Sequence, residues 1–269
     1  MDKKIIINAD DLGLSPGVNQ AILKVYTEGF LSHASLMANT EYFDDAVEEI
    51  IPKCSNLKVG VHVNLTCAKA LFPNNILAEN GLLKNDFVKL LFKRKTKKVL
   101  DSLENEIELQ ILKIKNKGIE ISHVDGHEHV HIIPSINKIV RKLAKKYSIP
   151  RIREINESFL TSFKYNLKTA TFANIIKLMI LRFLSISNAN TNEIQFYSIL
   201  NTCEINADNL FDYLENSTDE TVEIMLHPSI IELDKNIKNL EPRFIEFLNS
   251  DFRTQEFQLC FNKNFEKYV

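Results

Sequence analysis

The chain has 269 residues, of which 45% are hydrophobic and 25% charged, and its formal net charge at pH 7 is −2. These values are typical of a globular protein with room for one (β/α) barrel of about 250 residues, and they argue against a nucleic-acid-binding surface. The cysteines are scattered without a Cys-x-x-Cys pair, which argues against a disulfide framework or a zinc ribbon and favours a reducing compartment. They are Cys54, Cys67, Cys203 and Cys260.

Neither a leader peptide nor a membrane span is predicted. The apolar run near the N-terminus reaches Asp10 and Asp11 too soon to be the core of a signal peptide. The most apolar later segment, Phe172 to Ile186, is interrupted by Lys177 and Arg182, so we predict a buried helix there. We therefore expect a cytoplasmic protein with no membrane partner.

Strands and helices alternate along the chain. Residues 3–11 form an apolar run that stops at acids, which predicts a parallel strand buried on both faces. A helix follows, with Ser15 as N-cap, Pro16 at the first helical position and Gly29 at its end. Further strands are predicted at 31–39, 57–66, 118–127, 149–154 and 221–229, and further helices at 41–51, 87–117, 134–147 and within 156–192. This alternation predicts a parallel sheet, open or closed into a barrel, in a single domain over residues 1–269.

Polar side chains collect where four of these strands end. They are Asp10 and Asp11, His62, Asp125 with His127, and His227. Because the carboxyl ends of parallel strands meet on one face, where such folds place their active sites, we expect these groups to lie close together. Two imidazoles and one carboxylate hold a divalent ion and leave positions open for water and substrate. A second carboxylate can then act as general base and a further histidine as general acid, although spacing alone does not assign the roles.

The segment "HVDGHEHVH" is unusually rich in histidine. His127 lies where the predicted strand ends, which is a position for a metal ligand. Asp125 can hold a ligand histidine through the second ring nitrogen. His123 shares strand parity with these two residues and is expected to pack inside a barrel. His129 and His131 are typical of supporting or solvent-facing groups, and we do not predict either as a ligand.

The motifs "NADDLGLSPGVNQAI", "VGVHVNLT", "HVDGHEHVH" and "EIMLHPS", in this order, resemble the YdjC-like carbohydrate deacetylases, the group that includes chitooligosaccharide deacetylase. The resemblance runs from the first strand to the C-terminal His-Pro, which is most of the chain. It implies a distorted (β/α) TIM-like barrel related to the polysaccharide deacetylases, often a homodimer, with one divalent metal ion, Mg²⁺ or Zn²⁺. The chain departs from the family at Ser229, where glycine is common.

The resemblance also implies residue roles. The family's metal ligands match Asp11, His62 and His127. Its catalytic base matches Asp10 and its general acid matches His227. Arg153 and Glu154 match a further polar motif and are expected to bind substrate or to orient the base.

These observations favour metal-dependent hydrolysis of an N-acetyl group on an amino sugar or short oligosaccharide. A metallophosphohydrolase is an alternative, although such enzymes often carry His-x-His on the first strand and this strand ends in Asp-Asp. A non-catalytic carbohydrate- or metal-binding protein is another, and it would bind its metal with no open coordination position. The expected partners are the sugar substrate and a second copy of the chain, with no nucleic acid.

Overall fold

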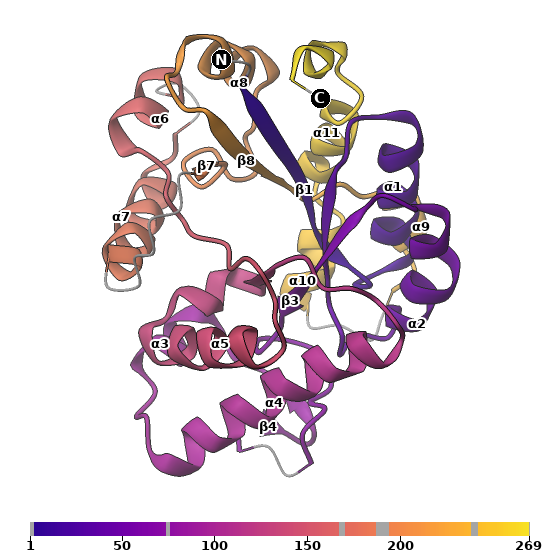
Figure 1. Cartoon of the computed structure of the whole chain (residues 1–269), viewed down its shortest axis with the longest axis vertical. Helices are drawn as coiled ribbons and strands as arrows, with labels where there is room; N and C mark the ends of the chain where they lie inside the picture. Colours follow the sequence, from indigo (N-terminus) through magenta and orange to yellow (C-terminus); the bar gives the residue numbers. More distant parts are fainter. Residues whose placement is uncertain (1–2, 74–75, 167–169, 187–193, 238–241, 269) are drawn as a thin grey trace.

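Six parallel strands form a curled sheet at the centre of the molecule (Figure 1). The computed structural model describes residues 3–73, 76–166, 170–186, 194–237 and 242–268. The strands are β1 (Lys4–Leu12), β2 (His33–Leu36), β3 (Lys58–Val63), β6 (Val124–Gly126), β7 (Ile194–Tyr197) and β8 (Thr221–Leu226). Their order is β6-β3-β2-β1-β8-β7, so the curled sheet confirms the predicted α/β class and distorted barrel.

Helices surround the sheet and connect its strands. They are α1 (Pro16–Glu28), α2 (Phe43–Asp45), α3 (Phe87–Phe92), α4 (Lys97–Asn116), α5 (Pro134–Lys146), α6 (Phe159–Asn166), α7 (Phe172–Ile186), α8 (Ala207–Asn216), α9 (Ile231–Asp234), α10 (Pro242–Leu248) and α11 (Asp251–Leu259). Strands β4 (Ala78–Glu79) and β5 (Leu82–Leu83) form a short antiparallel hairpin. The 3-10 segment η3 (His127–Ile132) follows β6. The first helix starts as predicted, because the Ser15 side chain accepts a hydrogen bond from Val18 N and Pro16 follows it.

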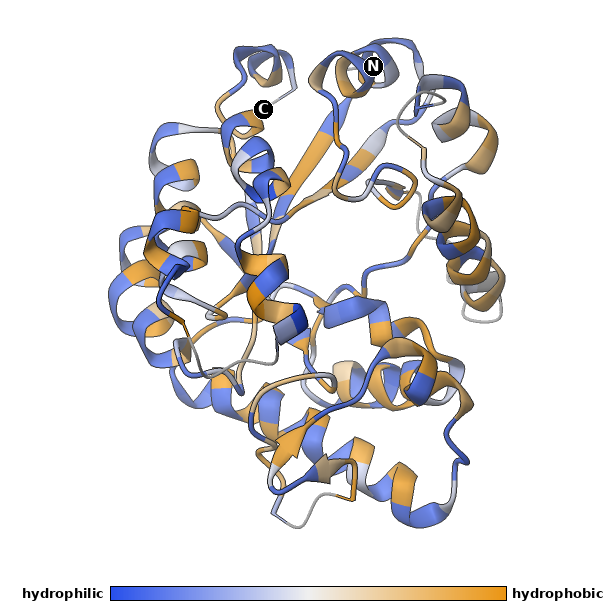
Figure 2. Ribbon diagram, turned by 180° about the vertical axis from the view of Figure 1, so that it is seen from behind, coloured by the Kyte–Doolittle hydropathy of each residue, from blue (hydrophilic) through white to orange (hydrophobic). Residues whose placement is uncertain are grey.

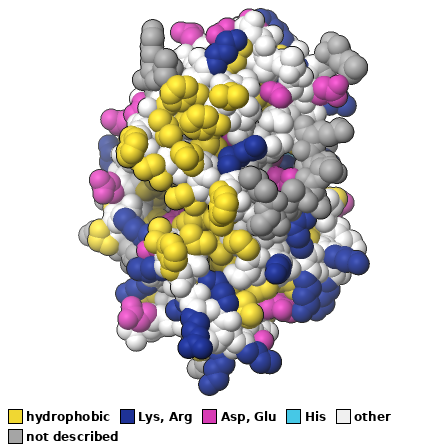
Figure 3. Space-filling view, turned by 90° about the vertical axis from the view of Figure 1, so that its left-hand side faces the viewer, with side chains coloured by type: hydrophobic (Ala, Val, Ile, Leu, Met, Phe, Trp, Pro, Cys, Tyr) yellow, Lys and Arg dark blue, Asp and Glu magenta, His cyan; other side chains and the backbone are white. Residues whose placement is uncertain are grey.

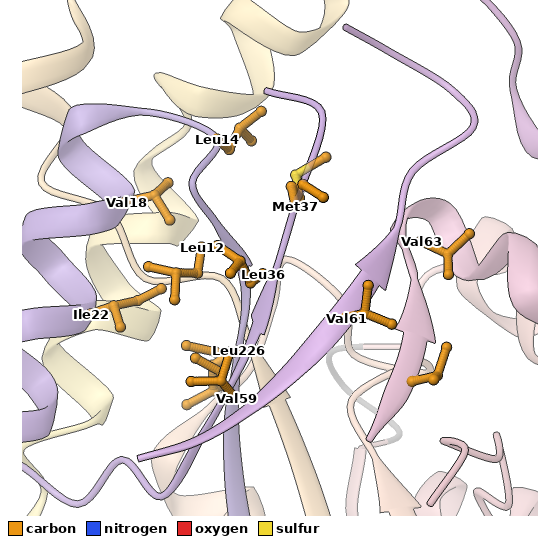
Figure 4. Packing of buried hydrophobic residues seen from close by; sticks show 14 of the residues in the cluster. Leu12, Leu14, Val18, Ile22, Leu36, Met37, Val59, Val61, Val63 and Leu226 are labelled. Atoms are coloured by element: carbon orange, nitrogen blue, oxygen red, sulfur yellow. The ribbon is translucent and has the colours of Figure 1, made fainter. Parts of the chain in front are cut away.

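The outer face of the sheet is apolar and packs against the helices. The central strands are largely hydrophobic (Figure 2). Val18 and Ile22 lie on the side of α1 that faces Leu12 and Leu36 of the sheet (Figure 4), and all four side chains are fully buried. Burying one such side chain contributes about 1.5–3 kcal/mol, so this face supplies much of the folding free energy.

The inner face of the sheet is polar although it is equally buried. It carries Asn8, Asp10, Ser35, His62, Asp125 and Glu223, with Arg153 among them. Space is tight here, because a Cβ atom on Gly60 would lie 2.3 Å from the His123 ring. The glycine therefore makes room for His123, which packs inside the barrel.

Three predicted elements differ from the structure, and one strand has no predicted counterpart. The strand expected at 118–127 is reduced to Val124–Gly126, and that expected at 149–154 is a single bridge from Ile152. The helix expected at 87–117 is two helices, because the chain is extended at Lys93. The short strand β7 was not predicted. Within 156–192 the expected helices are α6 and α7, while residues 167–169 and 187–192 lie outside the described part.

The prediction that residues 172–186 form a buried helix is wrong for one side of α7. Leu178 and Leu181 are buried against the second core cluster. Phe172 and Phe183, however, are 77% and 75% exposed, on a face rich in hydrophobic side chains (Figure 3). The helix is apolar on both sides, and composition alone does not show which side packs against the core. No helix of the described residues is long and apolar enough to cross a membrane.

Candidate active site

A distortion at the end of β1 points two successive aspartates into one cavity. The register of β1 against β2 shifts between Ala9 and Leu12, and Asp11 has a φ of 71°. Side chains of a regular strand alternate between its faces, whereas a bulge re-aims one of them. Asp10 and Asp11 both line a pocket of about 220 Å³ at the carboxyl ends of the strands. A left-handed conformation at a non-glycine residue is strained and is typical of functional sites.

Asp11 faces two histidines across this pocket. Its Oδ1 lies 3.5 Å from His62 Nε2 and 3.7 Å from His127 Nε2, and these separations are too long for good hydrogen bonds. Within the described part of the chain, this buried oxygen has no hydrogen-bond partner. Ligand atoms bound to one ion at about 2.0–2.2 Å lie roughly 2.8–3.8 Å apart, and both separations from Asp11 Oδ1 to the imidazole nitrogens fall in this range.

The second nitrogen of each histidine is held by a neighbouring oxygen. His62 Nδ1 lies 2.7 Å from Asp125 Oδ1, and His127 Nδ1 lies 2.7 Å from Thr66 Oγ1. Such bonds fix the ring orientation and leave Nε2 free to bind a metal. The opposite oxygen of Asp11 lies 3.3 Å from Arg253 NH1. The donor set and its supports therefore fit a divalent cation.

Charge in the site follows from burial and from the carboxylates. Burial lowers the pKa of His62, but Asp125, Asp10 and Asp11 raise it to about 10, so this position favours positive charge. Burial lowers the pKa of His127 to about 4 against the opposing effect of Asp11, so its imidazole is neutral at pH 7. Burial raises the pKa of Asp11, but His62, His127 and Arg253 hold it well below its usual range.

A second group of acids and histidine also has metal-like spacing. Ligand atoms of Asp10, His62 and Asp125 lie within 4.8 Å of one another. Arg153 already occupies this position, because its guanidinium contacts both Asp10 oxygens at 2.8 Å and Asp125 Oδ2 at 2.8 Å. A buried guanidinium between two carboxylates offsets part of their negative charge and repels a cation. The group around Asp11 is therefore the better candidate for an ion.

His227 lies at the same pocket, one residue beyond β8. Its backbone N–H donates to Glu256 Oε2, and its Nδ1 lies 3.3 Å from the same oxygen. The ring packs edge-on against Phe247 and Phe252. Ser229 is absent from the positive-φ residues, so this loop does not require the glycine common in the family.

Arg153 and Glu154 do not line the pocket. Arg153 is 1% exposed and lies beneath Asp10, and Glu154 lies 3.5 Å from Arg141. This placement gives no support to substrate binding by the pair, which stays a prediction, and it puts the Arg153 guanidinium in contact with both oxygens of Asp10. The five other predicted side chains do line the pocket: Asp10, Asp11, His62, His127 and His227.

Several residues that sequence reasoning missed also shape the pocket. Lys177 and Arg243 line it, Glu256 orients His227, and Thr66 orients His127. Of these, only Thr66 stands inside a motif, in "VGVHVNLT". The others come from helices, where no local pattern distinguishes them from ordinary surface or core residues.

The geometry defines a parallel α/β protein with a His–Asp site at the carboxyl ends of its strands. The model of the YdjC-like protein family matches residues 4–269, and the chain belongs to this family. A protein of Enterococcus faecalis V583 named for cellobiose-phosphate cleavage has the same fold, with a TM-score of 0.72 and 23% identity over 100% of this chain and 97% of that one.

The relatives of the chain include proteins named carbohydrate deacetylase. The protein of Clostridium beijerinckii is 30% identical over 85% of this chain and 82% of its own length. That of Listeria welshimeri is 29% identical over 90% of this chain and 89% of its own length. That of Brevibacillus brevis is 34% identical over 55% of this chain, and the match spans only 58% of the relative.

Proposed function

We propose that this protein is a metal-dependent hydrolase that removes the N-acetyl group from an amino sugar or a short N-acetylated oligosaccharide. The observation that carries the proposal is the buried Asp11 Oδ1, which has no hydrogen-bond partner among the described residues and faces Nε2 of His62 and of His127 in a pocket wall. The carbohydrate deacetylases among the relatives support the substrate class. The Asp-Asp end of β1, without His-x-His, gives no support to a phosphohydrolase.

Asp11, His62 and His127 hold one divalent ion in this proposal. Two imidazoles favour a zinc-like ion over magnesium, because magnesium prefers oxygen ligands. When bound, the ion polarises the acetyl carbonyl and lowers the pKa of a water molecule.

The remaining residues of the site move and hold protons. Asp10 accepts the proton of the attacking water, and Arg153 holds both of its oxygens so that the carboxylate keeps one orientation. His227 donates a proton to the departing nitrogen. Glu256 contacts Nδ1 of His227, which leaves Nε2 as the ring nitrogen that donates this proton. The products are acetate and a free amine.

The test is acetate release from a panel of N-acetylated sugars with different divalent metals. Asp11→Asn should lose both bound metal and turnover. Asp10→Asn should keep its metal and lose turnover by at least about 100-fold, as expected for a general base. Glu154→Gln is the matched control, since Glu154 lies outside the pocket, and it should keep turnover within about twofold.

The alternatives predict different results. Acetate release from no sugar with any metal would refute the deacetylase proposal. Unchanged turnover in Asp10→Asn would remove Asp10 from the mechanism, and unchanged metal content in Asp11→Asn would remove Asp11 from the ligand set.

A further inference from the structure

Exposed hydrophobic side chains gather on the face formed by α3 and α7 (Figure 3). Among the described residues, eleven large hydrophobic side chains are exposed, and seven of them lie on these two helices. They are Val88, Phe92, Phe172, Ile176, Met179, Ile180 and Phe183. A soluble protein seldom exposes so many apolar groups together unless the surface binds something.

A cavity of about 380 Å³, which we call the α3–α7 cleft, lies between the two helices. Phe87 and Val88 of α3 form one wall. Ala173, Ile176, Ile180 and Leu181 of α7 form the other. The volume falls within the range of about 300–1,000 Å³ that is usual for small-molecule sites. The cleft is therefore large enough for a ligand and has apolar walls.

The α3–α7 cleft adjoins the catalytic pocket. Glu128, His129 and Lys177 line both cavities. Both helices also contact the η3 segment, in which Glu128 and His129 have positive φ values of 52° and 58°. The strained backbone thus places two side chains at the boundary between the pocket that carries the acids and histidines and the apolar cleft.

This boundary offers one ring nitrogen that lacks a hydrogen-bond partner in the described part of the chain, and one ammonium group. His129 is 5% exposed, and its Nδ1 has no hydrogen-bond partner among the described residues. Burial lowers the pKa of the Lys177 ammonium, which also lies at the boundary. A sugar hydroxyl or a glycosidic oxygen would satisfy such groups, whereas an apolar group fits only the cleft beyond them.

We propose that the α3–α7 cleft binds an apolar aglycone of the same substrate whose N-acetylated sugar lies in the catalytic pocket. The substrate class is then an amphiphilic glycoside, in which a hydrocarbon or aryl group is linked to an acetylated amino sugar. The inference rests on the proposed deacetylase function for the sugar end. An aglycone is favoured over a second copy of the chain because the cleft is concave and shares a wall with the catalytic pocket.

The experiment compares acetate release from methyl, butyl and octyl glycosides of N-acetylglucosamine, each below its micellar concentration. Each buried methylene contributes up to about fourfold in affinity, so kcat/KM should rise at least about tenfold from methyl to octyl. The double variant Ile176→Ser/Ile180→Ser should abolish this rise and leave the methyl glycoside unaffected. The matched control, Phe172→Ser/Met179→Ser, changes two exposed residues of α7 outside the cleft and should keep the rise.

A binding measurement separates this inference from the proposed function. Octyl glucoside has no acetamide to hydrolyse, and calorimetry should detect its binding to the wild type but not to Ile176→Ser/Ile180→Ser. That result, combined with no acetate release from any glycoside, would support aglycone binding in the cleft and refute the proposed deacetylase activity. Two results would overturn the proposal that the cleft binds the aglycone. One is an equal kcat/KM for the methyl and octyl glycosides, and the other is loss of the rise in kcat/KM in the control variant as well.

A second copy of the chain is the competing occupant. Light scattering tests it by comparing the mass of the wild type with that of Ile176→Ser/Ile180→Ser. A wild-type dimer that this variant converts to a monomer, with no effect of alkyl length on kcat/KM, would overturn the proposal and assign the cleft to a dimer interface.

Discussion

The two faces of the central sheet are equally buried but are built from opposite chemistry. On the outer face, Leu12 packs against Val18 and Ile22 of α1. On the inner face, the Arg153 guanidinium is surrounded by the carboxylates of Asp10, Asp125 and Glu223. A substitution that shortens an apolar side chain lowers the free energy of unfolding in proportion to the buried area that is lost. Removal of one member of a buried ion network costs more, because a partner charge stays buried without its counter-ion. The outer face therefore supplies much of the folding free energy, whereas the inner face positions the polar groups of the candidate site and tolerates the loss of a member poorly.

The sharpest test of this contrast is removal of the central cation. Arg153→Met should lower the free energy of unfolding by about 3–5 kcal/mol, because three buried carboxylates lose the guanidinium that contacts all of them. Urea unfolding measures the loss. Arg151→Met is the control, since Arg151 also pairs with Glu223 but is partly exposed, and it should cost at most about 1 kcal/mol. Equal effects of the two substitutions would contradict the network.

Substitutions on the outer face should lower stability in proportion to the buried area they remove and should leave turnover unchanged. Ile7 is fully buried in the main core, and Ile7→Ala should destabilise by about 3 kcal/mol through lost burial and a residual cavity. Turnover per folded molecule should stay within about twofold. Urea unfolding and acetate release on the same sample check both parts, and a large fall in turnover at full folding would show that the two faces are not separable.

The difference between the faces also explains what could be predicted from sequence. The apolar run of β1, the Ser15-Pro16 helix start and the polar strand ends are local patterns, and the structure has the expected elements there. Asp10, Asp11, His62, His127 and His227 are predictable because each lies at or just beyond the carboxyl end of a strand, and the structure brings them to one pocket. Their roles, and the homodimer, stay predictions.

The rest depends on contacts that no local pattern records. The bulge that turns Asp11 beside Asp10 comes from the register against β2. Glu256 reaches His227 from α11, and Arg153 reaches Asp10 across the barrel, so both contacts exist only after folding. The exposure of one side of α7 could not be predicted, because an apolar composition favours burial but does not show whether another element packs against that side.

The charge network should also show in the acid stability of the protein. Burial raises the pKa of Glu223, but Arg153 and Arg151 lower it to about 2 in the folded protein. Because this lies below the unfolded value of about 4.3, the stabilisation is complete above that pH and is lost as the pH falls toward 2. The contribution is at most about 3 kcal/mol. Urea unfolding between these pH values should give a flatter profile for Glu223→Gln, and identical profiles would exclude Glu223 as a source.

The smallest expected effect concerns packing on the inner face rather than charge. A Cβ on Gly60 would lie 2.3 Å from His123 Nε2, so Gly60→Ala should destabilise by about 1–3 kcal/mol through overpacking. His123→Ala removes the obstacle, and the double variant should be more stable than the sum of the two single effects allows. The unfolding free energies of all four proteins give this coupling directly.

Additive losses would mean that the backbone moves away from the new methyl group instead of meeting the imidazole. Strand β3 carries His62 only two residues beyond Gly60, so such a movement should shift His62 and weaken the metal binding proposed for it. With coupling of the expected sign, metal content in the double variant should instead match the wild type. The inner face would then be rigid enough for a single methyl group to be accommodated only by removing its neighbour, which is the property that keeps Asp11, His62 and His127 in place.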